Sequence, residues 1–362
     1  MKRVKLVICW THISGYMAAC WRAMAARGEV ELKIVGFKSN VAGANINFQD
    51  DVVAGLDVRL MTPQEWGDAD VVRSLVAPHA PDVVVLPGWA YGSYRKLVDA
   101  RELARARFVM TMDTPARGTL RQRLGRYRLG RFLQRIDRVV VAGERAWQLA
   151  RVLGFDEARI RRGLYGVDYA GFSPLIEQRR SQPGGWPKRL LFTGRYHEEK
   201  GIDVLLAAYR AYRQSVSEPW PLTCCGTGPM SAAIDAEPGV TNRGFVQPAD
   251  MPPILASHGA FVLASRFDPW PLVIVEACAA GLPVVHTEAC GSAVELVRPY
   301  FNGLGVATES VDPLTRALRW CHDNHDKLPE MGARAQPLAA AYSAEAWADR
   351  WSRMLRELCD AR

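Results

Sequence analysis

Two cations stand in a segment of the second half of the chain that reads as a turn between a strand and a helix. Residues 194–201 read Gly-Arg-Tyr-His-Glu-Glu-Lys-Gly and follow the apolar run Arg189–Thr193. Such a turn presents backbone N–H groups at the positive end of the helix dipole. Arg195 can grip an anion through two hydrogen bonds, and Lys200 adds a point charge. The segment therefore predicts a diphosphate site, with a solvated basic turn as the alternative.

Two acidic residues lie further along, in the segment 265–277, SRFDPWPLVIVEA. Asp268 stands in a loop at the carboxyl end of a predicted strand, where α/β sheets bind ligands. Glu276 stands in an otherwise apolar helix, where burial of an unpaired carboxylate is costly. A pair of ribose hydroxyls would satisfy Glu276, and an internal salt bridge or hydrogen bond is the alternative. The helix start at about Leu272 offers further N–H groups to a phosphate.

Three other features are weaker signals. The segment 225–229, Cys-Gly-Thr-Gly-Pro, follows a predicted strand, and its glycines allow a ligand to approach the backbone closely. The segment 243–246, Arg-Gly-Phe-Val, follows a short strand and is suited to present backbone groups to a base. Each is equally consistent with a plain turn. His12, in the loop after the first predicted strand, either faces a ligand cleft or is a satisfied loop histidine.

Residues 117–135 hold seven arginines and no acidic residue. Leu120, Leu124, Tyr127 and Phe132 form a broken apolar stripe among them. The stretch predicts contact with anionic lipid head groups, or with a lipid diphosphate or other anionic acceptor. The alternative is a surface helix whose arginines face water or pair with acids elsewhere. The arginines assigned to acceptor or membrane contact are Arg117, Arg121, Arg123, Arg126 and Arg128.

The scaffold that positions these residues is predicted by short β-branched runs, which are typical of buried parallel strands. Their alternation with helical segments is that of doubly wound α/β domains. The predicted strands are Val4–Cys9, Glu31–Phe37, Asp82–Leu86, Phe108–Thr111, Arg138–Ala142, Arg189–Thr193, Pro221–Cys225, Ala260–Leu263 and Pro283–His286. The predicted helices are Tyr16–Ala26, Glu144–Leu153, Ile202–Arg213, Met251–Ala256, Leu272–Ala280, Val311–His322 and Ala344–Leu358. A loop, Trp10–Gly15, follows the first strand, and turn-rich segments near 166–188 separate two such domains.

Composition excludes several classes of protein. The 362 residues are 49% hydrophobic and 23% charged, which excludes a mostly disordered chain, a collagen-like fibre and a small disulfide scaffold. The formal net charge is +8, and the whole excess of positive charge lies in residues 1–172. This asymmetry indicates an acidic partner of the first half of the chain. Nucleic acid is not the expected partner, because no binding motif or aromatic interleaving accompanies the arginines.

The eight cysteines show no regular spacing, so we expect them to be reduced in a cytoplasmic protein. Cys321-His322-x-x-His325 looks like part of a metal site but lacks a fourth ligand nearby. The N-terminal apolar run is too short for a signal peptide, and no run approaches the ~20 apolar residues of a membrane span. We therefore expect a protein that associates at most peripherally with the inner face of a membrane.

The order of these motifs along the chain resembles that of a known family. The order is GRxxxxKG, GxGP, GFV, an acid followed after seven residues by Glu276, then Gly291-x-x-x-Glu295 and Asn302-Gly303. It is similar to that of the retaining family 4 glycosyltransferases, whose C-terminal domain is the glycosyl transferases group 1 domain. The similarity is close over residues 166–310 and loose over the N-terminal part. It implies the GT-B fold, with two Rossmann-like doubly wound domains facing across a cleft.

The resemblance also implies a division of the chain. Residues 1–168 would form an acceptor-binding domain, and residues 169–342 a nucleotide-sugar-binding domain. Residues 343–362 would form a helix that packs back on the first domain. Trp347, Trp351, Leu355 and Leu358 fall on one face of that helix.

Roles for individual residues follow from the resemblance. Arg195 and Lys200 would bind the donor diphosphate, and Glu276 the ribose hydroxyls. Asp268 stands where the family usually has Glu, and it would contact hydroxyls of the donor sugar. The other implied donor-binding residues are Gly15, in a loop with Ser14, and Gly226, Phe245, Val246, Trp270, Pro271 and Leu272.

One departure from the family concerns the first domain. The family often has His-Asp near the fifth strand, and this chain has Met112-Asp113. Met112 cannot donate a hydrogen bond to a sugar hydroxyl, so Asp113 would take part of that role. The predicted catalytic residues are Asp268, Asp113 and His12.

The implied reaction is transfer with retention from a UDP- or GDP-sugar to a hydroxyl of a glycan, lipid-linked or small-molecule acceptor. The acceptor would attack on the face that the diphosphate leaves, and no metal or other cofactor is expected to be obligatory. Two alternatives stay open at this point. The chain could be a catalytically weak or inactive nucleotide-binding member, or a nucleotide-sugar epimerase on the same fold.

Overall fold

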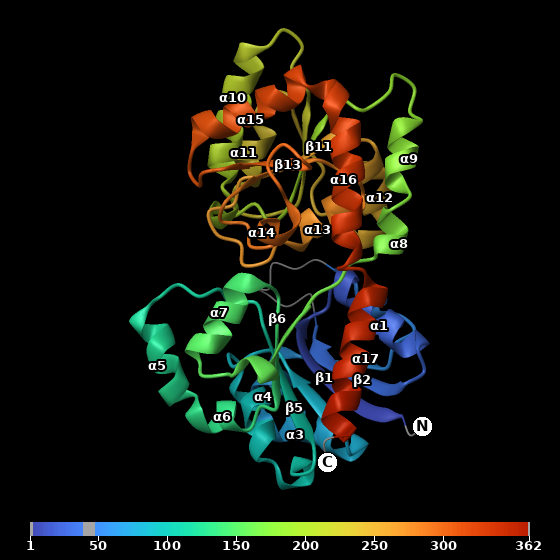
Figure 1. Ribbon diagram of the computed structural model, residues 1–362, viewed down its shortest axis with the longest axis vertical. Helices are drawn as coiled ribbons and strands as arrows, with labels where there is room; N and C mark the ends of the chain where they lie inside the picture. The colour runs from blue at the N-terminus through green and yellow to red at the C-terminus, as the bar shows by residue number, and fades with distance from the viewer. Residues whose placement is uncertain (1–2, 39–47, 361–362) are drawn as a thin grey trace. The chain divides into compact units, whose positions relative to one another are not determined.

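The computed structural model describes residues 3–38 and 48–360. The chain forms two compact units, one of residues 1–166 with 344–362 and one of residues 167–343 (Figure 1). Each unit is built on a parallel β-sheet with helices connecting its strands. The predicted fold class, two Rossmann-like α/β units, is confirmed.

The sheet of the first unit has seven strands within the described residues, in the order β3-β2-β1-β4-β5-β6-β7, and every neighbouring pair is parallel. The strands are β1 (Val4–His12), β2 (Val30–Phe37), β3 (Val58–Met61), β4 (Val83–Leu86), β5 (Arg107–Met112), β6 (Arg138–Val141) and β7 (Ile160–Arg162). All four residues of β4 are buried, as expected for a central strand covered on both faces.

The helices of the first unit are α1 (Gly15–Ala26), α2 (Pro63–Gly67), α3 (Ala69–Val76), α4 (Gly92–Arg95), α5 (Leu120–Arg128), α6 (Gly130–Gln134), α7 (Glu144–Val152) and α17 (Ala344–Asp360). The last of these packs against α1, although most of the chain separates the two in sequence (Figure 1). Trp347 Nε1 donates a hydrogen bond to Leu164 O (2.8 Å), and Trp351 Nε1 donates to Gly163 O (3.1 Å). The four apolar residues predicted to share one face of this helix are all buried.

The sheet of the second unit is also parallel, in the order β10-β9-β8-β11-β12-β13. Its strands are β8 (Leu190–Thr193), β9 (Leu222–Cys225), β10 (Val240–Asn242), β11 (Ala260–Leu263), β12 (Val284–Thr287) and β13 (Gly303–Val306). Its helices are α8 (Tyr169–Phe172), α9 (Leu175–Arg180), α10 (Ile202–Ser215), α11 (Ser231–Asp235), α12 (Met251–Ala256), α13 (Leu272–Ala279), α14 (Ala293–Leu296), α15 (Val311–Asp323) and α16 (Leu328–Ala340). The loops after β9, β8 and β11 leave the same edge of this sheet, because adjacent parallel strands end together.

The structure corrects two local expectations. The segment predicted as a loop from Trp10 begins inside β1, because the buried strand continues to His12 and pairs there with Phe37 of β2 after a register shift. The turn-rich stretch near 166–188 is not an open linker. Its Arg179 is fully buried in the second unit and donates to four backbone carbonyls, those of Leu255, His258, Ala280 and Gly281, over 2.7–3.2 Å.

Candidate functional site

Backbone hydrogen bonds join three of the predicted motifs at one edge of the second sheet. The bonds run from the N–H of Gly194 to Cys225 O (3.0 Å), from Tyr196 to Thr227 O (2.8 Å) and from Gly226 to Gly244 O (2.7 Å). The motifs therefore form one continuous surface of loops after β8, β9 and β10. Phe245 and Val246, the residues predicted to lie near the base, are half-buried next to the last of these bonds.

The two glycines of the 225–229 turn are required by packing between loops. A Cβ atom on Gly226 would lie 1.9 Å from Gly194 O, and one on Gly228 would lie 2.6 Å from Tyr196 O. Either contact would push the two turns apart, since backbone atoms cannot yield as a flexible side chain does. The sequence predicted that these glycines allow a ligand to approach the backbone closely. The structure shows that they allow a neighbouring turn to pack closely.

Lys200 and Asp268, which have separate predicted roles, form an ion pair. Lys200 Nζ donates to Asp268 Oδ2 over 2.5 Å, and the side chains are only 13% and 10% exposed. Burial raises the pKa of Asp268, while the Lys200 charge acts in the opposite direction. The pair ties the loop after β8 to the loop after β11, and a diphosphate bound there would compete with Asp268 for the ammonium group.

Arg195 is also paired with a carboxylate. Its guanidinium donates to Glu199, four residues further along the same loop, and both side chains are substantially exposed. An exposed pair of this kind is weak and exchanges its partner at little cost. Both cations predicted to bind a diphosphate are therefore present on one loop, each held by an acid.

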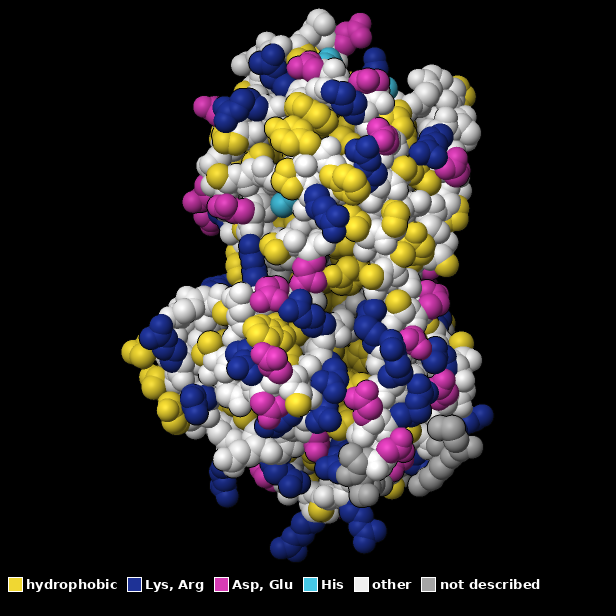
Figure 2. Space-filling view, in the orientation of Figure 1, with side chains coloured by type: hydrophobic (Ala, Val, Ile, Leu, Met, Phe, Trp, Pro, Cys, Tyr) yellow, Lys and Arg dark blue, Asp and Glu magenta, His cyan; other side chains and the backbone are white. Residues whose placement is uncertain are grey.

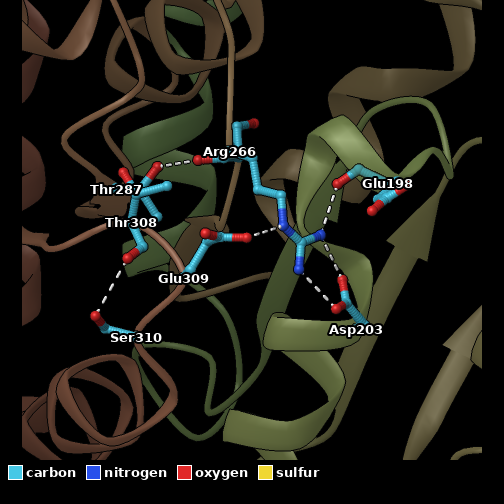
Figure 3. Close-up of polar contacts among 8 residues, drawn as sticks. Glu198, Asp203, Arg266, Thr287, Thr308, Glu309 and Ser310 are labelled. Atoms are coloured by element: carbon cyan, nitrogen blue, oxygen red, sulfur yellow. Dashed lines mark hydrogen bonds and ion pairs between the residues drawn. The ribbon is translucent and has the colours of Figure 1, made fainter.

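Arg266 organises the same loops and was not singled out by the sequence. Its guanidinium donates twice to Asp203 (2.7 Å each), once to Glu309 (2.7 Å) and once to the carbonyl of Glu198 (2.8 Å) (Figure 3). Its backbone N–H donates to Glu199 O (2.8 Å). These bonds lower the pKa of Asp203 and join the loop after β11 to the start of α10 and to the segment before α15. No pattern of types and spacings could have identified this residue, because its partners come from two segments, 198–203 and 309, that are distant from it in sequence.

Glu276 is the exception among the charged groups of this region. Within residues 3–38 and 48–360, its carboxylate has neither a hydrogen-bond nor an ion-pair partner, and burial raises its pKa to about 7. Its neighbours Val275 and Ala277 on α13 are buried in the core. The internal salt bridge or hydrogen bond that the sequence left open is therefore absent from the described part of the chain. A half-buried, unpaired carboxylate of this kind is suited to accept hydrogen bonds from ligand hydroxyls.

The start of α13 is held rigidly. Pro271 is its N-terminal cap residue, and Pro271 O accepts a hydrogen bond from Ser292 Oγ (2.9 Å). Trp270 is buried, with its ring 5.9 Å from that of Tyr342. A Cβ atom on Gly291 would lie 1.8 Å from Pro269 O, so this glycine permits the close approach of its loop. The first-turn N–H groups of α13, beginning at Leu272, are thus placed on a fixed backbone.

The predicted residues of the first unit follow or end its strands, and Asp113 and His12 have different partners. Asp113, just after β5, accepts a hydrogen bond from Tyr165 Oη (3.0 Å). Its neighbour Met112 is buried. The His12 ring packs edge-on against Phe37 and Trp66, with centroids 5.9 and 6.3 Å away, and burial lowers its pKa.

Gly15 and the arginine stretch are the remaining predicted features of the first unit. Gly15 is the first residue of α1, after the buried Ser14. A pocket of about 950 Å³ in the first unit is lined by Asp113 and by Arg117, Arg121 and Arg128 from the arginine stretch. His12, Arg123 and Arg126 are not among its lining residues. The structure therefore divides the five arginines into two groups.

The second unit matches a described protein family. Residues 187–324, which contain the sheet edge and the loops above, match the family model of Glycosyl transferases group 1. The second unit carries a group 1 glycosyltransferase domain. The predicted resemblance to this family is confirmed.

Relatives of the group 1 domain extend over much of this chain. The chain is 28% identical over 284 residues to D-rhamnosyltransferase WbpZ of Pseudomonas aeruginosa, covering 75% of this chain and 66% of that protein. It is 32% identical over 153 residues to a GDP-mannose-dependent alpha-mannosyltransferase of Mycobacterium tuberculosis, covering 40% of this chain and 38% of that protein. The chain thus spans at most about two thirds of the length of these curated relatives.

A solved structure shows that the similarity in fold includes both units. The structure of Anabaena Alr3699/HepE in complex with UDP and glucose matches with a TM-score of 0.71 at 19% identity, covering 97% of this chain and 99% of that one. At this identity the match establishes the GT-B fold class and nothing finer.

Across the residues that the structure describes, no group of three His, Cys, Asp or Glu side chains is arranged to hold a metal ion. The Cys321-His322-x-x-His325 motif is dispersed, since His322 Nδ1 contacts Tyr212 Oη (2.9 Å) and His325 Nε2 contacts Trp186 O (2.7 Å). None of the described helices combines the length and the apolar character needed to cross a membrane.

Proposed function

We propose that this protein is a retaining family 4 glycosyltransferase that moves a sugar from a nucleoside diphosphate sugar to a hydroxyl group of an acceptor. The group 1 domain binds the donor, and the first unit binds the acceptor. The observation that carries the proposal is the half-buried carboxylate of Glu276, which has no partner within the described residues, in the domain where Arg195 and Lys200 stand on one loop. A ribose and a diphosphate supply the hydroxyl donors and the negative charge that these side chains require.

Donor binding proceeds by exchange of partners. The diphosphate takes Arg195 from Glu199 and Lys200 from Asp268, and the N–H groups at the start of α13 donate to it. Asp268, released from the ammonium group, accepts hydrogen bonds from hydroxyls of the donor sugar. The backbone around Phe245 and Val246 contacts the base. The base is uracil or guanine, in line with the UDP bound to Alr3699/HepE and the GDP-mannose dependence of the mycobacterial relative.

In the proposed transfer, stabilisation of the departing diphosphate is more important than a nucleophilic side chain of the protein. The bond between the anomeric carbon and the diphosphate oxygen breaks while the acceptor oxygen forms a bond to the same face of that carbon. The acceptor proton passes to the departing diphosphate. Arg195, Lys200 and the α13 N-terminus stabilise the charge that develops on the diphosphate, so no metal ion or other cofactor is required by the proposal.

Peripheral membrane association is supported by the outer surface of α5. Leu120 is 69% exposed, Leu124 39% and Tyr127 72%, and these residues lie three and four positions apart, on one side of the helix. Arg123 and Arg126 stand among them. Figure 2 shows hydrophobic and basic side chains gathered over α5, at the left of the first unit. We infer that this face rests on the anionic inner face of a membrane, in a cytoplasmic protein.

The test separates this proposal from its alternatives. Thermal shift is measured with UDP, GDP and ADP, and hydrolysis of the corresponding sugar nucleotides follows, with the anomer of the released sugar determined by NMR. Stabilisation by UDP or GDP and a product of retained configuration are expected. No stabilisation by any nucleotide would refute the proposal. Binding without turnover on any acceptor would favour an inactive member, and conversion of the sugar nucleotide into its epimer would favour an epimerase.

A further inference from the structure

The first-unit pocket is a cavity of about 950 Å³ that lies wholly within one unit. Its walls come from the carboxyl ends of β1, β4 and β5, where Trp10, Trp89 and Asp113 stand, and from α5. The carboxyl ends of parallel strands are where α/β sheets bind ligands. Its size is that of a cavity for a small organic molecule.

The charges that line this pocket are unbalanced. Four arginines and one aspartate are the charged residues among its walls: Arg95, Arg117, Arg121, Arg128 and Asp113. Within the described residues, Arg121 and Arg128 form no ion pair, and Arg95 Nε is buried with no hydrogen-bond partner. Asp113 accepts from Tyr165 Oη and pairs with none of these arginines. A cavity with this excess of guanidinium groups is suited to bind an anion of more than one charge.

The position of α5 decides which arginines reach the pocket. Arg121 and Arg128 are seven residues apart, two turns of the helix, so they point in the same direction. Gly125 lies between them, and a Cβ atom there would lie 3.2 Å from Leu153 Cδ2, which shows how closely the helix packs on the end of α7. Arg123 and Arg126 do not line the cavity. The predicted alternative was arginines that face water or pair with acids elsewhere; Arg121 and Arg128 are exposed and pair with no acid in the described residues.

The other walls of the pocket suit a ring that carries hydroxyl groups. Trp10, Trp89 and Tyr165 supply aromatic surface, with the Trp10 and Tyr165 rings edge-on at 6.5 Å. Among the described residues, the half-buried Asp113 carboxylate accepts from the Tyr165 hydroxyl alone, and it keeps the capacity to accept more hydrogen bonds. Aromatic faces and a carboxylate together provide stacking and hydroxyl recognition in one cavity.

We propose that the first-unit pocket binds an acceptor that carries a phosphate or diphosphate ester next to a hydroxyl-bearing ring. Arg95, Arg121 and Arg128 bind the anion, while Trp89 and Asp113 hold the ring. The identification of this ligand as the acceptor rests on the proposed function. The same chemistry is found in soluble sugar phosphates and in lipid-linked sugar diphosphates.

The test compares two pairs of substitutions on one helix. Arg121→Gln with Arg128→Gln removes two lining cations, and Arg123→Gln with Arg126→Gln removes the same charge from α5 outside the pocket. Affinities for inorganic pyrophosphate and glucose 1-phosphate are measured by calorimetry on the full chain, first alone and then with the donor site saturated by the nucleotide that stabilises the protein. We expect the first pair to weaken both affinities by more than tenfold and the second by less than twofold.

Equal losses in the two pairs would overturn the proposal, because a diffuse positive field would then explain the binding. Failure of the wild-type protein to bind either anion would overturn it as well. Absence of any nucleotide effect would refute the proposed function alone, since anion binding in the pocket is measured without nucleotide too. Tighter binding of geranyl diphosphate than of glucose 1-phosphate would identify a lipid-linked acceptor, and the reverse order a soluble sugar phosphate.

Discussion

The two candidate binding regions of this protein differ in whether their cations are paired. In the group 1 domain, Lys200 and Arg266 are each bonded to carboxylates that hold neighbouring loops together. In the first unit, Arg121 and Arg128 line a cavity and have no acidic partner within the described residues. A paired cation keeps a loop in place until a ligand competes for it, whereas an unpaired one leaves its full charge for the ligand. From this difference we expect an anion to be attracted by unpaired charge in the first-unit pocket, and to displace paired acids in the group 1 domain.

Glu276 provides the strongest test of this comparison, because its carboxylate has no partner within the described residues although it lies in the group 1 domain. We expect Glu276→Ala to weaken nucleotide affinity more than tenfold, since the ribose hydroxyls lose their acceptor, which corresponds to a loss of more than about 1.4 kcal/mol. Calorimetry with the preferred nucleoside diphosphate measures the effect. Glu218→Ala, an exposed substitution in the same unit, serves as the control. Unchanged affinity in Glu276→Ala would refute the ribose assignment.

The raised pKa of Glu276 also predicts how nucleotide affinity depends on pH. Because ribose hydroxyls donate to the ionised carboxylate, affinity for a nucleotide sugar should rise as pH increases from 6 to 8, through the pKa of about 7. The rise should approach tenfold, the factor expected over one pH unit below the pKa. Glu276→Gln should remove this dependence, and a slope that persists in that variant would assign it to another group.

Ionisation of the Glu276 carboxylate should lower the stability of the folded protein, although it should raise nucleotide affinity. The pKa of Glu276 in the folded protein lies above its ordinary value of 4.5, so the folded state binds more protons than the unfolded state between these values. The contribution of Glu276 to stability is therefore present at low pH and is lost as pH rises from about 4.5 to 7. Denaturant unfolding of the wild-type protein and Glu276→Gln at pH 5 and pH 8 measures it. The variant should lack this loss.

Substitution of Arg266 tests whether this paired cation positions the loops that are proposed to bind the donor. Arg266→Lys keeps the charge but loses the double hydrogen bond to Asp203, so the loop that carries Asp268 should become less ordered. We expect nucleotide affinity to fall about fivefold and kcat to fall with it. Arg210→Lys, which weakens an ion pair with Glu237 in the same unit, is the matched control. An equal loss of nucleotide affinity in Arg210→Lys would show that Arg266 stabilises the unit in general and does not position the donor loops.

The smallest of the predicted effects concerns membrane binding by the outer face of α5. Leu120→Ser with Tyr127→Ser removes exposed apolar surface without changing charge, and binding to vesicles that contain phosphatidylglycerol should weaken about threefold. Affinity for inorganic pyrophosphate should not change, because neither residue lines the first-unit pocket. Co-sedimentation with vesicles measures the first quantity. If the wild-type protein does not bind these vesicles, membrane association is refuted.

Local patterns were sufficient for most of the scaffold. Apolar runs such as Asp82–Leu86 identify buried strands because both faces of a parallel sheet exclude water. Strands such as β7 and β13 were missed, since three residues with two arginines, or four with two glycines, carry no such signal. The sequence left open whether Glu276 has an internal partner, and the structure shows none within the described residues, because its neighbours on α13 are apolar.

The sequence by itself determined the alternating architecture, the charge asymmetry and the residue types that suit a diphosphate and a ribose. Only the tertiary structure decided which charges are paired. Lys200 and Asp268 lie far apart in sequence, and Arg266 draws its partners from two distant segments. It also decided which arginines of α5 line the first-unit pocket, since the packing of Gly125 against Leu153 sets how the helix is turned. The physical reason is that pairing depends on distances between elements, which no local spacing contains.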